Sequence, residues 1–172
     1  MTILFSYDGS PHADAAITAA SRLLGQREAS AVVLAVWEPL LVQALRSERF
    51  GSMTLAVPAG VDEDDGRSSE AARRLAEHGA VLAREAGFDA QARWVADSRT
   101  IASTVIESAD ELDADLIVMG SRGLRGISAF LGSVSNHVLQ HTHRPVLIVP
   151  SASDVRAPEA KAAGAARTPA GE

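Results

Sequence analysis

The sequence contains no cysteine among its 172 residues. This absence excludes disulfide bonds, thiol chemistry and zinc–thiolate sites. Aromatic residues are scarce at 4%, whereas alanine and valine are abundant. That balance favours helices packed closely on a sheet over an aromatic-rich β-sandwich. The length predicts one domain with a substantial core, followed by a tail.

The charge balance and the short apolar runs exclude further classes of protein. The formal net charge is −6 at pH 7 and Lys161 is the only lysine, so no nucleic acid partner is expected. No run of about 18 apolar residues occurs, so no membrane span is expected. The amino terminus enters an apolar strand pattern without a basic region or a cleavable apolar segment, so we expect a cytoplasmic protein.

Short apolar runs alternate with helical periodicity over the first 150 residues. Ser10 and Pro11 are typical of a helix start, and Gly25 and Gly87 of helix ends. The expected strands are residues 2–7, 31–37, 90–96, 116–119 and 145–149, and the expected helices are 11–24, 68–86, 100–112 and 134–141. This alternation predicts an α/β fold with an open, mostly parallel five-stranded sheet and helices on both faces.

Two segments depart from the pattern. Residues 38–66 mix apolar pieces with Pro, Gly and an acidic cluster at 62–65, which predicts a functional flap or a disordered insertion. The acidic cluster is a candidate metal site, but we favour a solvated loop ahead of a helix, whose dipole suits carboxylates. Residues 151–172 are rich in Ala, Pro and Gly and are expected to form a disordered tail, which leaves 1–150 as the domain.

A glycine-rich loop follows the fourth expected strand. Gly120, Gly123 and Gly126 precede Gly132 and Ser133, which lie at the start of the last expected helix. Strand, loop, helix and strand together form a βαβ crossover, with the loop where open parallel sheets bind ligands. Glycines allow main-chain amides to form an anion nest, and the helix start adds partial positive charge. The alternative is a tight connection that holds no ligand.

No Walker lysine accompanies these glycines. A phosphate would therefore be held mainly by the backbone, with Arg122 or Arg125 as outer charges. Ser133 can cap the helix or donate its hydroxyl to a phosphate oxygen.

The spacing of Gly120, Gly123, Gly132 and Ser133 resembles the nucleotide-binding signature of the universal stress protein family, G-x2-G-x9-G-[S/T], which precedes a helix and a final strand reading PVLIV. Eight residues instead of nine separate Gly123 from Gly132. The resemblance extends over about residues 2–150. It implies a Rossmann-like fold of the adenine nucleotide alpha hydrolase type, with strand order 3-2-1-4-5. It also implies that ATP, or another adenine nucleotide, places its phosphates over this loop, with Mg²⁺ or Mn²⁺ on the phosphates.

Further positions match the family. The resemblance implies that Asp8 contacts the ribose or adenine side, although turn or cap chemistry is its alternative role. Val36 matches the position whose backbone meets the adenine ring. Ser135 either reaches the phosphates or is an exposed helix serine. The expected nucleotide site comprises Asp8, Val36, Gly120, Arg122, Gly123, Gly132, Ser133, Val134 and Ser135.

The histidines and the missing catalytic motifs bear on enzymatic activity. His137 and His141 have a spacing that can hold a metal, but they lie near a helix C-terminus where the dipole favours imidazolium, so we favour surface or packing roles. No nucleophile elbow and no obvious general base are present. We expect no dedicated catalytic residues and at most slow ATP hydrolysis.

The terminal strand, residues 145–149, is expected to be an apolar sheet edge without a lysine. The resemblance implies homodimerisation through this strand. Three functions then compete: a nucleotide-binding regulatory protein of stress physiology, a dimeric interaction module whose short loop no longer holds nucleotide, and an ATP-using enzyme of the adenylating pyrophosphatase type. The last lacks its SGGxDS loop, because SYDGSPHAD follows the first strand.

Overall fold

The computed structural model describes residues 1–25, 29–40, 42–43, 61–97, 99–121 and 131–150. Its sheet contains five strands: β1 (Thr2–Ser6), β2 (Ser30–Trp37), β3 (Asp89–Ala96), β4 (Leu116–Gly120) and β5 (Val146–Val149). They are arranged in the order β3-β2-β1-β4-β5, and all four pairings are parallel. The expected strand order is confirmed.

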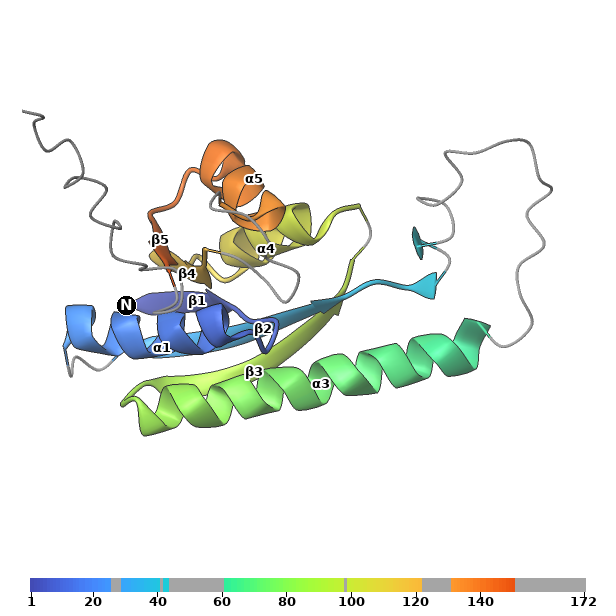
Figure 1. Cartoon of the computed structure of the whole chain (residues 1–172), viewed down its shortest axis with the longest axis horizontal. Coiled ribbons are helices and arrows are strands. Elements are labelled where there is room, and N and C mark those ends of the chain that lie inside the picture. The colour runs from blue at the N-terminus through green and yellow to red at the C-terminus, as the bar shows by residue number, and fades with distance from the viewer. Residues whose placement is uncertain (26–28, 41, 44–60, 98, 122–130, 151–172) are drawn as a thin grey trace, which may run out of the picture.

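Two helices cover each face of the sheet (Figure 1). Helices α1 (Pro11–Leu24) and α3 (Val61–Glu85) lie on one face, and α4 (Ile101–Glu111) and α5 (Ser133–His141) on the other. Strand side chains alternate between these layers. In β1, Ile3 and Phe5 pack in the core under α1 and α3, and Leu4 packs in the core under α4 and α5. The α/β architecture with helices on both faces is therefore confirmed.

Helix α1 has the expected ends. Ser10 is its N-cap, and its hydroxyl accepts a hydrogen bond from the Ala13 amide at 3.2 Å. Pro11 occupies the first helical position, where its missing N–H costs nothing. Gly25 ends the helix with φ +69, a conformation that glycine adopts without strain.

Helix α3 begins earlier than expected. It starts at Val61 instead of residue 68, so the solvated loop predicted for residues 62–65 is wrong. Asp62, Glu63 and Asp64 lie in the first helical turn, where carboxylates interact favourably with the helix dipole. The Asp65 carboxylate accepts a hydrogen bond from the Leu40 amide at 2.7 Å. The same charges that predicted a loop therefore stabilise a helix start.

The apolar stripe of α3 is also displaced from the expected one. Helical spacing in the sequence predicts a core-facing stripe of Ala71, Leu75, Leu82 and Ala86. Ala71 is exposed instead, whereas Leu75, Leu82 and Ala86 pack against the core. The buried positions lie on the adjacent line of the helix and are small residues, namely Ala72, Ala76, Gly79, Ala80 and Ala83. Small side chains let the helix lie close to the sheet, which explains why the larger leucines flank the contact.

The two helices on the other face differ from expectation at their starts. Thr100 caps α4 by accepting a hydrogen bond from the Ser103 amide at 3.0 Å. The helical spacing predicts that Ile101 points inward, but it is 37% exposed, and it lines a cavity while its neighbour Ala102 is buried in the core. Gly132, not Ser133, is the N-cap of α5, and no side chain caps that helix. The capping role considered for Ser133 is therefore wrong.

Several predictions fall outside the described residues. These are the disordered tail at 151–172 and most of the segment 38–66, together with Arg122, Gly123, Arg125 and Gly126. The flap and the tail stay predictions. None of the helices in the described ranges combines the length and apolar character needed to cross a bilayer.

Candidate functional site

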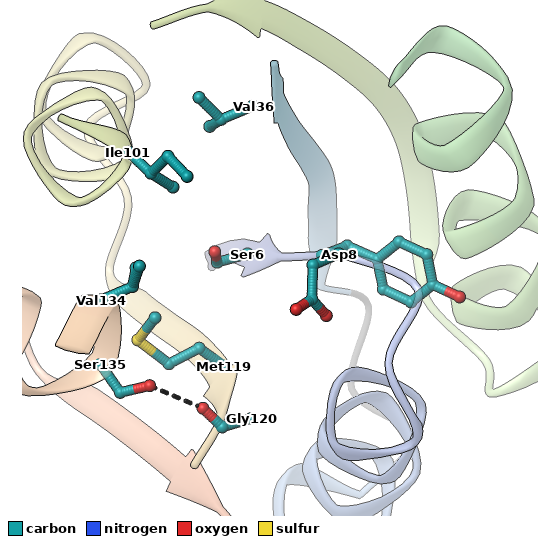
Figure 2. A pocket seen from close by; sticks show the side chains of 9 residues that line it. Ser6, Asp8, Val36, Ile101, Met119, Gly120, Val134 and Ser135 are labelled. Carbon is teal, nitrogen blue, oxygen red and sulfur yellow. Dashed lines mark hydrogen bonds between the residues drawn. The ribbon is translucent and has the colours of Figure 1, made fainter. Parts of the chain in front are cut away.

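A cavity lies at the carboxyl ends of the central strands (Figure 2). Strand β1 has β2 on one side and β4 on the other, so the chain order reverses at β1, and such switch points form crevices in open α/β sheets. The cavity has a volume of about 130 Å³. It is lined by Ser6, Tyr7, Asp8, Val36, Ile101, Met119, Gly120, Val134 and Ser135.

Apolar side chains from four elements form much of the cavity wall. Val36 comes from β2, Met119 from β4, and Ile101 and Val134 from the starts of α4 and α5 (Figure 2). Walls of this kind, with few polar groups among them, suit a flat apolar ring system with polar edges. Ile101 and Met119 were not among the predicted site residues; Met119 had been identified only as the end of an apolar run.

Asp8 supplies a carboxylate to this cavity. It follows β1 directly, and its Oδ1 accepts a hydrogen bond from the Ser10 amide at 3.0 Å. This bond is the turn chemistry considered for Asp8. Because Asp8 also lines the cavity, the turn role and a ligand role are compatible.

The main chain of Val36 is directed toward the cavity side of β2. The Leu34 carbonyl accepts from the Tyr7 amide on the β1 side, and the Trp37 carbonyl accepts from the Asp97 amide on the β3 side. Backbone groups of successive residues in a parallel ladder point to opposite neighbours, so residues two apart point to the same one. The N–H and C=O of Val36 therefore point to the β1 side, where the last β1–β2 pair is Ser6 with Leu34.

Gly120 lines the cavity, but its lack of a side chain has a packing cause. A Cβ at this position would lie 2.6 Å from His12 Cβ and 2.8 Å from the His12 carbonyl carbon. Real Cβ atoms essentially never approach backbone so closely. Glycine is therefore required here for the contact between the end of β4 and the start of α1.

Ser135 is buried at the wall of the cavity. It is 4% exposed, and its hydroxyl donates a hydrogen bond to the Gly120 carbonyl at 2.9 Å. The dashed line in Figure 2 marks this bond between α5 and the end of β4. The alternative of an exposed helix serine is wrong.

Ser133 lines an adjoining groove instead of the cavity. This groove has a volume of about 260 Å³ and is lined by Thr100, Ile101, Ala102, Ser133, Val134 and His137. It shares Ile101 and Val134 with the cavity, so the two spaces adjoin at the starts of α4 and α5.

Two amides beside the glycine-rich loop already have internal partners. The Gly132 amide donates to the Ser121 carbonyl at 2.7 Å, and the Ser121 amide donates to the Val149 carbonyl at 2.8 Å. Gly132 therefore shapes the backbone at the end of the loop, where it is the N-cap of α5, and its amide is already bonded within the protein. Arg122 and Gly123 belong to the part of the chain outside the described residues.

Tyr7 is the other titratable residue at the cavity, and sequence analysis did not select it. Its hydroxyl donates to Asp14 Oδ1 at 2.7 Å. Burial, together with this bond to a carboxylate, raises the pKa of Tyr7 above its usual value. Tyr7 therefore stays protonated at neutral pH and is unsuited to act as a general base. Across the described ranges, no group of three or more metal-binding side chains is gathered.

Comparison with known proteins matches this arrangement to one family. The model of the universal stress protein family matches residues 1–150. A universal stress protein of Thermus aquaticus is 32% identical over 149 residues, which are 86% of this chain and 97% of that protein. A shorter match, 45% identical over 58 residues, covers 33% of this chain and 31% of the universal stress protein Sll1388 of Synechocystis.

Solved structures show the same fold. The universal stress protein UspA of Lactobacillus plantarum has a TM-score of 0.66 at 19% identity, covering 87% of this chain and 97% of that one. An Arabidopsis thaliana protein of the family, solved with AMP bound, has a TM-score of 0.60 at 14% identity, covering 90% and 94%. With a family match across almost all of the described fold, the chain belongs to the universal stress protein family.

Proposed function

We propose that this protein binds ATP at the switch-point cavity and acts as a regulatory protein of stress physiology. The observation that carries the proposal is the combination of apolar walls with the main chain of Val36 directed toward the end of β1. An adenine ring needs such a slot, because its faces are apolar and its edge carries donors and acceptors. Asp8, on the β1 side, is placed to accept hydrogen bonds from ribose hydroxyls.

The phosphates would extend from this cavity along the adjoining groove. The cavity of about 130 Å³ is smaller than the roughly 300–1,000 Å³ of most ligand pockets, so it suits the base and the groove suits the remainder. Ser133 and Val134 lie in the first turn of α5, which no side chain caps. Helix starts of this kind favour phosphate. Gly123 and Arg122 would complete the phosphate site, and Mg²⁺ or Mn²⁺ would be carried on the phosphates.

Relatives with bound nucleotides support the choice of base. Besides the Arabidopsis protein with AMP, a universal stress protein has been solved with cAMP and one from Archaeoglobus fulgidus with dAMP. These ligands share adenine and carry one phosphate. The proposal of a triphosphate rests on the glycine-rich loop of this chain.

Calorimetry with ATP and Mg²⁺ tests the proposal. We expect a Kd below about 100 μM, equivalent to about −5.5 kcal/mol, and weaker binding of GTP. Gly123→Val should abolish binding and Asp8→Ala should weaken it, whereas Asp62→Ala, at the start of α3, serves as a matched carboxylate control and should bind normally. A folded wild-type protein that gives no ATP binding at millimolar nucleotide contradicts the proposal.

Efficient catalysis is not part of this proposal. Among the described residues that line the cavity itself, Tyr7 and Asp8 are the titratable ones, and the Tyr7 hydroxyl is engaged as a donor to Asp14. Neither side chain is arranged to activate a water molecule for attack on a phosphate, and the groove adds His137, whose ring is stacked on that of His141. We therefore propose turnover that is slow at most, so that the bound nucleotide acts as a signal.

A second candidate function is a dimeric interaction module without nucleotide. Two observations favour it. The close contact with His12 explains why residue 120 is glycine without any need for a ligand. The amides of Gly132 and Ser121 already donate to carbonyls within the protein. Acid extraction of the purified protein separates the two functions, because a nucleotide carrier should release adenine nucleotide in substoichiometric to stoichiometric amounts. In either case we propose a cytoplasmic homodimer that pairs through β5.

A further inference from the structure

Helix α5 carries a pair of histidines that the nucleotide proposal does not use. His137 and His141 are one turn apart, with ring centroids separated by 4.0 Å and ring planes inclined by 16°. His137 is half-buried beside the groove and His141 is exposed. The spacing was visible in the sequence, whereas the stacking of the two rings is a property of the fold.

A hydrogen bond fixes which nitrogen of His141 is available. His141 Nδ1 lies 2.9 Å from the carbonyl oxygen of His137. A carbonyl oxygen only accepts, so Nδ1 must carry the proton and donate. In the neutral ring the lone pair is then on Nε2, which belongs to an exposed side chain. Metal-binding histidines usually have this arrangement, with the other ring nitrogen donating to a carbonyl or carboxylate.

We propose that His137 and His141 form a two-histidine surface site for a late first-row divalent cation, with Cu²⁺ bound more tightly than Ni²⁺ or Zn²⁺. Metal–imidazole bonds of about 2.0–2.1 Å place two adjacent ligand nitrogens roughly 3 Å apart. The stacked rings, inclined by 16°, direct their nitrogen lone pairs along nearly parallel planes, so both side chains must rotate before they converge on one ion, which the exposure of His141 allows. Holding both side chains on one helix face reduces the entropy lost when the second ligand binds.

The ligand set determines the preferred metal. Two imidazoles with water at the remaining positions suit tetragonal Cu²⁺, and affinities at nitrogen sites generally peak at copper. A structural zinc site normally needs four protein ligands, and in the described part of the chain no third metal-binding side chain joins the pair. This site is chemically distinct from the oxygen-bound Mg²⁺ expected on nucleotide phosphates, so either proposal can fail without the other.

The experiment uses the untagged full-length chain, titrated with Cu²⁺ and followed by calorimetry and electron paramagnetic resonance. We expect one equivalent to bind with nitrogen hyperfine structure from two imidazoles. His137→Asn and His141→Asn should each weaken binding at least tenfold and remove one nitrogen from the spectrum. The chain has five histidines, so His78→Asn and His143→Asn provide matched controls that should bind as the wild type does.

Two results would overturn this site. One is unchanged copper affinity in the His137→Asn/His141→Asn double variant, which would place the ion at the amino terminus or another histidine. The other is a loss of binding in His143→Asn equal to that in His141→Asn. Circular dichroism of each variant establishes that it is folded, and Cu²⁺ should raise the melting temperature of the wild type but not of the double variant.

Discussion

Ser133 and Ser135 lie two positions apart on α5, and their side chains have different surroundings. The hydroxyl of Ser135 is buried and donates to the Gly120 carbonyl, so it ties α5 to the end of β4. Ser133 is exposed beside the groove in which we place the phosphates. The same residue type therefore has a structural role at one position and a proposed ligand role at the other.

Replacing these two serines should separate stability from binding. Ser135→Ala leaves a buried carbonyl without its donor, so we expect the free energy of unfolding to fall by about 1–3 kcal/mol. Ser133→Ala should change stability by no more than about 0.5 kcal/mol but weaken ATP binding. Urea unfolding and calorimetry on both variants test this; equal stability losses would contradict the distinction.

A methyl group at Gly120 should be costly even without a ligand. The added Cβ would meet the Cβ and backbone of His12, which α1 holds in place. We expect Gly120→Ala to lower the free energy of unfolding by about 1–3 kcal/mol. Gly66→Ala is the matched control, since nothing lies within 4 Å of its added Cβ and the residue is helical. Alanine there should stabilise by up to about 1 kcal/mol. Urea unfolding measures both changes.

Among elements, α3 shows how local charge acts on a long helix. Glu70 is bonded to Arg73, with an N–O distance of 2.7 Å, and to Arg74, at 3.1 Å. The hydrogen bond from Arg73 has the largest effect and that from Arg74 the next largest, and together they lower the pKa of Glu70 to about 2. Arg74 is exposed and Glu70 and Arg73 are partly exposed, so salt screens both ion pairs.

This shift predicts a pH dependence with a definite sign. The folded-state pKa of Glu70 lies below its ordinary value of 4.5, so its contribution is present above about pH 4.5 and is lost as pH falls toward 2. The wild type should lose this contribution to the free energy of unfolding as the pH falls, whereas the Glu70→Gln variant, which lacks the carboxylate, should not. Unfolding followed between pH 2 and 7 in low salt measures it, and high salt should reduce the difference. A wild type and variant that lose stability in parallel would contradict the prediction.

Most elements were predictable because their signals are local. Ser10, Pro11 and Gly25 mark the ends of α1 by their own backbone preferences, and the apolar runs identified all five strands. The start of α3 was not predictable, because Asp62 is equally suited to a loop and to a first helical turn. The structure adds a contact from outside the helix, the hydrogen bond from the Leu40 amide to Asp65, which local sequence does not reveal.

Part of the cavity lining was expected from the sequence, through the family resemblance for Asp8 and Val36 and through the glycine pattern for Gly120, and the part that depends on packing was not. Asp8, Val36 and Gly120 line the cavity because parallel strands end together at the switch point. The exposure of Ile101 and the burial of Ser135 depend on how α4 and α5 lie against the sheet. No short-range pattern in the sequence carries that information.

At the scale of the whole molecule, β5 is an edge of the described sheet and presents alternate backbone groups outward. The carbonyls of Pro145 and Val149 accept from β4, so Leu147 also faces β4, and the amides of Val146 and Ile148 point away. An open apolar edge of this kind invites pairing with another strand. The geometry is compatible with the proposed homodimer.

Proline at alternate positions of β5 should distinguish dimer loss from unfolding. Ile148→Pro removes an outward amide and should give a folded monomer, because proline is tolerated at a strand edge where its N–H faced out. Leu147→Pro removes a bond to β4 and should destabilise the fold. Sedimentation at micromolar protein, with Ile148→Val as control, tests this; a wild type that is monomeric at all concentrations rules out the dimer.

The unequal lengths of β1 and β2 bear on how related proteins can keep the same ligand preference while their side chains diverge. Pairing of β2 with β1 ends at Leu34, but pairing with β3 continues to Trp37. If the base is recognised by the peptide groups of this overhang, exchange of Val36 for another β-branched residue leaves recognition intact, whereas deletion of a single β2 residue reverses the direction of those groups. Divergent relatives could then keep one ligand class with few shared side chains around it.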